Sequence, residues 1–147
     1  MLIRFFLYGL LGWTVEILFT AISSKLRGRA EGWRLRGWTY LYMFPIYGLC
    51  APLFEPAHDR LRHLPWPLRG LIWTAGIFAV EYAAGWGLRR ATGRCPWDYA
   101  LAGARWHVHG LIHLGYAPLW LGFGLALEFL HDRFVVLTPA IRAAFSS

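Results

Sequence analysis

Charged side chains are scarce in this chain of 147 residues. Only 16% of the residues are charged, against roughly 25% in an average soluble domain, and 57% are hydrophobic. The apolar residues fall in long blocks, which favours a membrane protein over a large soluble core. The 15 Lys and Arg residues outnumber the 8 Asp and Glu residues. No nucleic-acid motif accompanies this positive charge, so membrane topology and anionic lipid headgroups explain it better.

Cysteine and the usual catalytic motifs are also nearly absent. The two cysteines, Cys50 and Cys95, provide neither a disulfide framework nor a paired metal motif, and we interpret them as unpaired thiols. There is no GxSxG, no Walker phosphate loop and no Rossmann fingerprint. The sequence therefore predicts no enzymatic activity and no bound cofactor. If ATP drives this protein, another subunit must hydrolyse it.

Four apolar segments are candidates for membrane-spanning helices, since about 20 helical residues cross the hydrocarbon core. They are residues 2–22, 38–54, 70–91 and 110–130. The second is short, and both it and the fourth contain proline, which membrane helices tolerate. The first segment also resembles a signal peptide, but Glu16 interrupts its apolar run, and we interpret it as retained.

The two halves of the chain are similar to each other. Residues 33–60 align without gaps on residues 106–133, and the first and third apolar segments match at a different offset. The matched pairs include Trp33 with Trp106, Gly37 with Gly110, Pro45 with Pro118, Glu55 with Glu128, His58-Asp59-Arg60 with His131-Asp132-Arg133, Arg4 with Arg69, Glu16 with Glu81, and Gly28-Arg29 with Gly93-Arg94. Such polar residues are rare in apolar segments, so duplication is favoured over chance similarity.

This repeat predicts an all-α integral membrane bundle of four transmembrane helices, built from two tandem, parallel-repeat helical hairpins. The hairpins would be residues 1–60 and 61–133, followed by a short tail at 134–147 that lies at the membrane interface. Loop charge gives the orientation. The loops at 23–37 and 89–109 contain nine Lys and Arg residues against six elsewhere. This excess predicts that these loops are cytoplasmic and that both termini are outside.

Glu16 and Glu81 are the first candidates for a functional site. A carboxylate inside a membrane helix is costly unless it is paired, protonated or hydrated. The pair could bind a proton or cation, or line a polar path. The alternative is structural: each glutamate would join neighbouring helices by hydrogen bonds, as interhelical polar residues commonly do.

The loop before the last apolar segment carries the second group of candidates, Trp97, Asp98 and Tyr99. Its aromatic residues suit the membrane interface, and Asp98 is expected to pair with an arginine such as Arg94 or Arg105. The alternative is a turn that only anchors the hairpin.

Histidines provide two further patterns. His109 and His113 would share a face if they lay on a helix, and could then bind zinc or haem iron, but no third ligand is close in sequence. Interfacial histidines are the favoured interpretation. The two His-Asp-Arg motifs could form acid–base clusters with Glu55 and Glu128, or could simply be polar helix ends.

These residues also support a family resemblance across nearly the whole chain. The chain resembles the CmpB-type, ABC-transporter type IV membrane proteins, which are related to vertebrate transmembrane protein 229. The likeness rests on motifs from both halves. They are Gly12-Trp13-x-x-Glu16, Arg36-Gly37, Phe44-Pro45-Ile46-Tyr47-Gly48, Glu81, Pro96-Trp97-Asp98-Tyr99 and His107-Val108-His109-Gly110.

The chain departs from the family pattern at three places. Pro96 and Ala100 stand where the family has Trp and Ser, His107 and His109 stand where it has Asn, and Leu35 stands where it has Asn. The resemblance implies a multi-pass membrane protein of permease type and adds Pro45 and Tyr47 to the candidate binding residues.

Three functions remain open from the sequence. The first is a permease-like component that binds or moves a small solute or ion through Glu16 and Glu81. The second is a scaffold or lipid-binding protein that transports nothing. The third and least favoured is metal or haem binding through His109 and His113. Because four helices enclose little space, transport would need a homodimer or partner subunits in the cell membrane.

Overall fold

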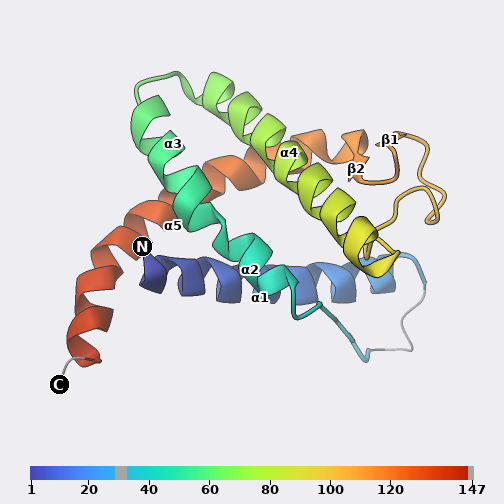
Figure 1. Ribbon diagram of the computed structural model, residues 1–147, viewed down its shortest axis with the longest axis horizontal. Coiled ribbons are helices and arrows are strands. Elements are labelled where there is room, and N and C mark those ends of the chain that lie inside the picture. The colour runs from blue at the N-terminus through green and yellow to red at the C-terminus, as the bar shows by residue number, and fades with distance from the viewer. Residues whose placement is uncertain (29–32, 146–147) are drawn as a thin grey trace. The chain divides into compact units, whose positions relative to one another are not determined.

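The computed structural model describes residues 1–28 and 33–145, and this part of the chain is mostly helical (Figure 1). The predicted dominance of α-helix is thus confirmed. Arg29, which the repeat alignment matched with Arg94, lies outside the described residues. The elements are α1 (Leu2–Leu26), α2 (Met43–Gly48), a π-helical segment (Cys50–Phe54), α3 (Glu55–Leu61), α4 (Trp66–Thr92), β1 (His107–Val108), β2 (Ile112–His113), a 3₁₀ segment (Leu114–Tyr116) and α5 (Ala117–Ala144).

Helices α1 and α4 are each long and apolar enough to cross a membrane. Only 22% of the most apolar stretch of α1 and 17% of that of α4 is buried. A core helix of a soluble protein would be mostly buried, so this exposure favours a lipid environment. Helix α4 is also well delimited: Pro67 lies in its first turn, and Gly93 ends it with a φ of 78°.

Residues 38–54, predicted as one helix, do not form a single regular α-helix in the structure. Helix begins only at Met43, and it continues to Leu61 as α2, the π-helical segment and α3. Pro52 lies inside the π-helical segment. Because proline has no N–H and crowds the preceding turn, it disturbs the regular α-helical hydrogen-bond ladder. Pro45 lies in the first turn of α2, where its missing N–H costs nothing.

The prediction of a helix over 110–130 was wrong for the first residues of that segment. Strands β1 and β2 pair there as an antiparallel hairpin, with His107 opposite His113. His109 and Gly110 both adopt positive φ, at 53° and 72°, and a backbone bond of 2.9 Å from Leu111 N–H to Val108 C=O closes the turn. Two successive positive φ values suit a tight hairpin turn and exclude an α-helix.

Helix α5 therefore begins at Ala117, with Pro118 in its first turn instead of mid-helix. At its other end the helix continues through Pro139 to Ala144, so residues 134–144 of the predicted tail are helical. Phe134-Val135-Val136-Leu137 adds an apolar turn directly after the His-Asp-Arg motif, with no glycine to end the helix.

The chain divides into two compact units. Residues 1–59 and 131–147 form unit 1, and residues 60–130 form unit 2. In unit 1, helix α1 packs on α2 through glycines: rings of Phe44 and Tyr47 occupy the space where Cβ atoms of Gly9 and Gly12 would be. In unit 2, the Trp73 side chain of α4 likewise occupies the space where a Cβ atom of Gly124 of α5 would be.

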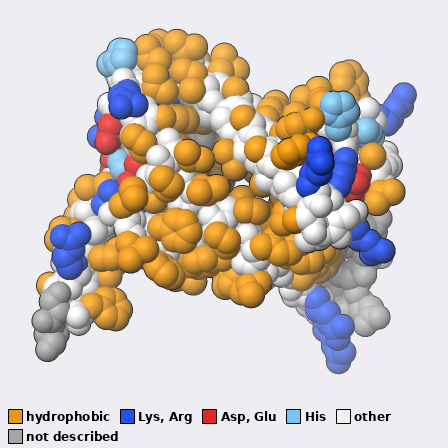
Figure 2. All heavy atoms as spheres, in the orientation of Figure 1, with side chains coloured by type: hydrophobic (Ala, Val, Ile, Leu, Met, Phe, Trp, Pro, Cys, Tyr) orange, Lys and Arg blue, Asp and Glu red, His pale blue; other side chains and the backbone are white. Residues whose placement is uncertain are grey.

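Large apolar side chains lie exposed along α1 and α4. Figure 2 shows hydrophobic side chains spread over much of the visible surface. On α1 the exposed residues include Leu2, Phe6, Leu10, Leu18 and Ile22. Their number fits a lipid-facing surface, because soluble monomers rarely expose large contiguous apolar patches.

Candidate functional sites

Glu81 lies on α4 in unit 2, and its two carboxylate oxygens have different surroundings. Tyr99 O–H donates a hydrogen bond of 2.6 Å to Oε1. Oε2 is buried, and no described donor meets hydrogen-bonding distance and angle at this atom. The Trp120 indole approaches the carboxylate, but its Nε1 is likewise buried and lies outside hydrogen-bonding geometry. One oxygen is thus held in place while the other keeps unused acceptor capacity.

The Trp97-Asp98-Tyr99 loop is bonded to the β-hairpin through Trp97 and Tyr99, and Asp98 holds the loop's own backbone. Trp97 Nε1–H donates to Leu111 C=O at 3.0 Å, and the Tyr99 N–H donates to Gly110 C=O at 2.9 Å. Asp98 Oδ1 accepts the backbone N–H groups of Ala100 and Leu101. The loop therefore delivers the Tyr99 hydroxyl to Glu81 from a rigid turn.

Asp98 pairs with an arginine as predicted, but its partner is Arg89 and not Arg94 or Arg105. Arg89, on α4, donates to Asp98 Oδ2 at 3.0 Å and to His109 C=O at 3.0 Å, so one guanidinium links the helix, the loop and the hairpin. Burial first, and then the nearby Glu81 charge, raise the pKa of Tyr99 above its ordinary value. Its hydroxyl therefore stays protonated as a hydrogen-bond donor.

Glu16 lies on α1 in unit 1 and has two donors on one oxygen. Thr39 O–H donates to Oε2 at 2.6 Å and Tyr47 O–H donates to the same atom at 2.9 Å. The prediction named Tyr47 but missed Thr39, which lies before the helix begins and had no motif to mark it. Pro45 lines a neighbouring apolar pocket with Trp13 and Phe44 and has no polar contact with Glu16.

Each unit also contains one bidentate ion pair. In unit 1, Arg4 donates to Glu55 at 2.6 and 2.8 Å. In unit 2, Arg69 donates to Glu128 at 2.8 Å through both nitrogens, and Trp73 Nε1–H adds a bond of 2.7 Å to Glu128. Both oxygens of each of these glutamates accept a hydrogen bond from an arginine, which distinguishes them from Glu81.

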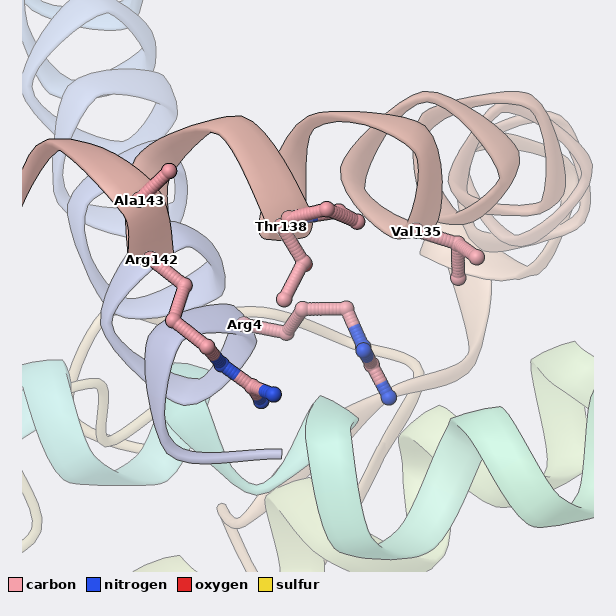
Figure 3. Close-up of a pocket in the computed structure, with 6 residues that line it drawn as sticks. Arg4, Val135, Thr138, Arg142 and Ala143 are labelled. Carbon is pink, nitrogen blue, oxygen red and sulfur yellow. The ribbon is translucent and has the colours of Figure 1, made fainter. Parts of the chain in front are cut away.

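A pocket of about 380 Å³ lies next to the first of these pairs. Figure 3 shows Arg4 and Arg142 among its lining side chains, from α1 and from the end of α5. Thr138 and Val135 of α5 complete one wall. The pocket is open and basic, and Arg4 is already bound to Glu55.

The histidines predicted as metal candidates lie apart from any helix. His109 occupies the hairpin turn, where Tyr82 O–H lies 2.8 Å from its Nδ1, and His113 lies on β2 against Tyr99 and Tyr116. These two histidines therefore do not share a helical face, and the prediction of metal binding by His109 and His113 loses the geometry on which it was based.

The two His-Asp-Arg motifs instead bring histidines together in unit 1. The His58 and His131 rings lie 4.9 Å apart, edge to face, with exposed fractions of 1% and 5%. Asp132 Oδ1 lies 3.9 Å from His58 Nε2, and Asp59 Oδ1 lies 3.6 Å from His131 Nε2. The repeat alignment equated the two motifs but gave no sign that they would meet.

The chain belongs to the family described as "Putative ABC-transporter type IV", whose model matches residues 3–144. No solved structure matches the chain. The family and the two apolar helices together indicate a membrane protein associated with ABC-type transport. The resemblance noted from the sequence motifs is thereby confirmed at the level of the family.

Proposed function

We propose that this protein is a permease-like membrane component that binds a small cation, proton or polar solute at Glu81, with Glu16 as a second binding point. The observation that carries the proposal is the buried Oε2 of Glu81, at which no described donor reaches hydrogen-bonding geometry. A carboxylate oxygen without donors inside an apolar helix costs free energy, and proteins retain such groups mainly at functional sites.

The surroundings of Glu81 fit binding better than simple helix packing. Tyr99 orients the carboxylate from a loop that Asp98 and Trp97 hold in place. A rigid second residue that positions a carboxylate, while leaving one oxygen available, is the arrangement expected of a binding point.

We further propose a multi-pass topology in the cell membrane. Helices α1 and α4 supply two spans, and the segmented helix over Met43–Leu61 and the apolar start of α5 would supply two more. The loops at 23–37 and 89–109 would be cytoplasmic. Support for a tandem duplication comes from the matched ion pairs, Arg4–Glu55 in unit 1 and Arg69–Glu128 in unit 2.

A permease-like function would require partner subunits. The chain has no phosphate-binding loop, so an ATPase subunit would have to supply ATP hydrolysis. A homodimer, or assembly with other membrane subunits, would enlarge the path that four helices can enclose.

The test compares detergent-purified wild type with Glu81→Gln and the Glu16→Gln/Glu81→Gln double variant, by thermal unfolding from mildly acidic to neutral pH. Glu128→Gln is the matched control, since it removes a carboxylate of the same unit whose two oxygens both accept hydrogen bonds. We expect the Glu81 variants to be as stable as wild type, and Glu128→Gln to be less stable. Proteoliposomes should then show proton or cation flux for wild type and none for Glu81→Gln. Destabilised Glu81 variants with unchanged flux would refute the proposal.

A scaffold function is the second candidate, and Glu16 favours it. Both of its donors converge on one oxygen, from Thr39 and Tyr47. Such bonds join segments of the chain without leaving a binding site. In that case Glu16→Gln alone would lower the unfolding temperature and leave flux unaffected.

A further inference from the structure

The histidine cluster of unit 1 has the composition of a metal site. His58, His131 and Asp132 each offer one ligand atom, and these atoms all lie within 4.8 Å of one another. Ligand atoms about 2.0–2.2 Å from a zinc ion lie roughly 3.3 Å apart in a tetrahedron, so small side-chain rotations would close the site. The motifs that supply these ligands are 73 positions apart in the gap-free alignment, and α3 and α5 bring them together.

His131 is already oriented for this role. Its Nδ1 lies 3.3 Å from the Tyr8 hydroxyl and 3.6 Å from Glu55 Oε1. A proton on Nδ1 directed at these two oxygens leaves the lone pair of Nε2 free to bind a metal. Metal-ligating histidines characteristically direct their other nitrogen to a carboxylate or similar acceptor.

We propose that His58, His131 and Asp132 bind a divalent transition-metal ion of the zinc class. Two imidazoles and a carboxylate suit Zn²⁺ and the neighbouring first-row ions better than Mg²⁺ or Ca²⁺, which prefer oxygen ligands alone. The Asp59 carboxylate, 3.6 Å from His131 Nε2, is placed to become a fourth ligand.

The proposed ligands combine buried imidazoles, which would hold the ion away from water, with exposed carboxylates, which solvent can reach. The imidazoles are almost fully buried, whereas the Asp132 and Asp59 side chains are 47% and 67% exposed. The carboxylates would capture the ion from solvent, and the histidines would hold it. A bound ion would tie α3 to α5 within unit 1. The site is independent of Glu81 and survives if the transport proposal fails.

The test uses the full chain, purified without a polyhistidine tag and stripped with chelator. Titration with Zn²⁺ followed by calorimetry, and with Co²⁺ followed by visible absorption, should show saturable, stoichiometric binding. Zn²⁺ should also raise the unfolding temperature, because binding to the folded state stabilises it by mass action. We expect Asp132→Asn and His58→Ala to lower the affinity at least tenfold.

Two matched variants serve as controls. His63→Ala removes an exposed histidine outside the cluster, and His109→Ala removes the histidine of the hairpin turn. Both should bind Zn²⁺ as wild type does. Asp132→Asn keeps the shape of a half-exposed side chain, so it tests the site even if His58→Ala fails to fold. Absence of saturable binding by wild type, or equal affinity in wild type and Asp132→Asn, would overturn the proposal.

Discussion

Arg4 donates two hydrogen bonds to Glu55, one from Nε at 2.6 Å and one from Nη2 at 2.8 Å. The Glu55 side chain is 7% exposed, so the pair joins the start of α1 to the start of α3 with little competition from solvent. Bidentate pairs of this kind fix geometry as well as adding energy. Arg69 and Glu128 form the same arrangement in unit 2.

Loss of the Glu55 charge should therefore weaken unit 1. Glu55→Gln removes the charge-assisted bonds while keeping the side-chain shape, and we expect it to cost about 1–3 kcal/mol of unfolding free energy. The exchange Arg4→Glu/Glu55→Arg should recover part of that loss, whereas each single reversal should not. Thermal unfolding in detergent measures all four proteins, and an exchange no better than the single reversals would contradict a specific pair.

Close approach of α4 and α5 in unit 2 depends on one glycine. A Cβ on Gly124 would collide with the Trp73 side chain, whereas one on Gly122 of the same helix would meet nothing within 4 Å. We expect Gly124→Ala to destabilise the protein by about 1–3 kcal/mol through overpacking, and Gly122→Ala to have no such effect. Because Trp73 also binds Glu128, Gly124→Ala should change the environment of the indole, which tryptophan fluorescence can report. Equal stability of the two variants would show that this contact is not tight.

The long apolar helices could be predicted from the sequence because their signal is local. Residues 2–22 and 70–91 are mostly apolar, and both formed helices that extend a few residues beyond the predicted ends. The hairpin at 107–113 was missed because the apolar character of its neighbours suggested a helix. His109-Gly110 was the available signal, since polar residues followed by glycine favour the positive φ values of tight turns.

In the candidate sites, too, single residues could be predicted from the sequence, whereas their contacts could not. Glu81 and Tyr99 were identified individually, because a carboxylate in an apolar segment is conspicuous in any sequence. Their contact at 2.6 Å was not predicted, since it depends on a loop whose path is set by Asp98 and Arg89. The meeting of His58 with His131 is a property of tertiary packing alone.

Alkaline pH should test the Tyr99–Glu81 contact. Burial and the Glu81 charge raise the pKa of Tyr99, so the folded protein holds this proton more tightly than the unfolded chain. The contribution to stability is then fully present below the unfolded pKa of about 10 and is lost as pH rises above it. Tyr99→Phe should reduce the alkaline fall in unfolding temperature, while Tyr40→Phe, at a 41% exposed residue, should not. Parallel alkaline curves for wild type and Tyr99→Phe would argue against this contact.

Membrane orientation can be tested with paired cysteines in a background lacking Cys50 and Cys95. Ala102 lies exposed in the loop predicted to be cytoplasmic, and His63 lies exposed in the loop predicted to be outside. An impermeant maleimide should label His63→Cys in intact cells, and Ala102→Cys only after permeabilisation. The reverse pattern would invert the topology, and labelling of both in intact cells would contradict an odd number of spans between them.

Tyr8 offers the most selective test of the metal proposal, because it touches the site through His131 and would not itself bind the ion. Its side chain is 2% exposed, and its hydroxyl lies 3.3 Å from His131 Nδ1. Tyr8→Phe removes the oxygen and keeps the ring packed against Phe134. Loss of such an outer partner typically lowers metal affinity about 10–100-fold, so Tyr8→Phe should bind Zn²⁺ more weakly while unfolding at nearly the wild-type temperature when no metal is present. A merely structural role for Tyr8 would give the opposite result: lower stability without metal and unchanged Zn²⁺ affinity.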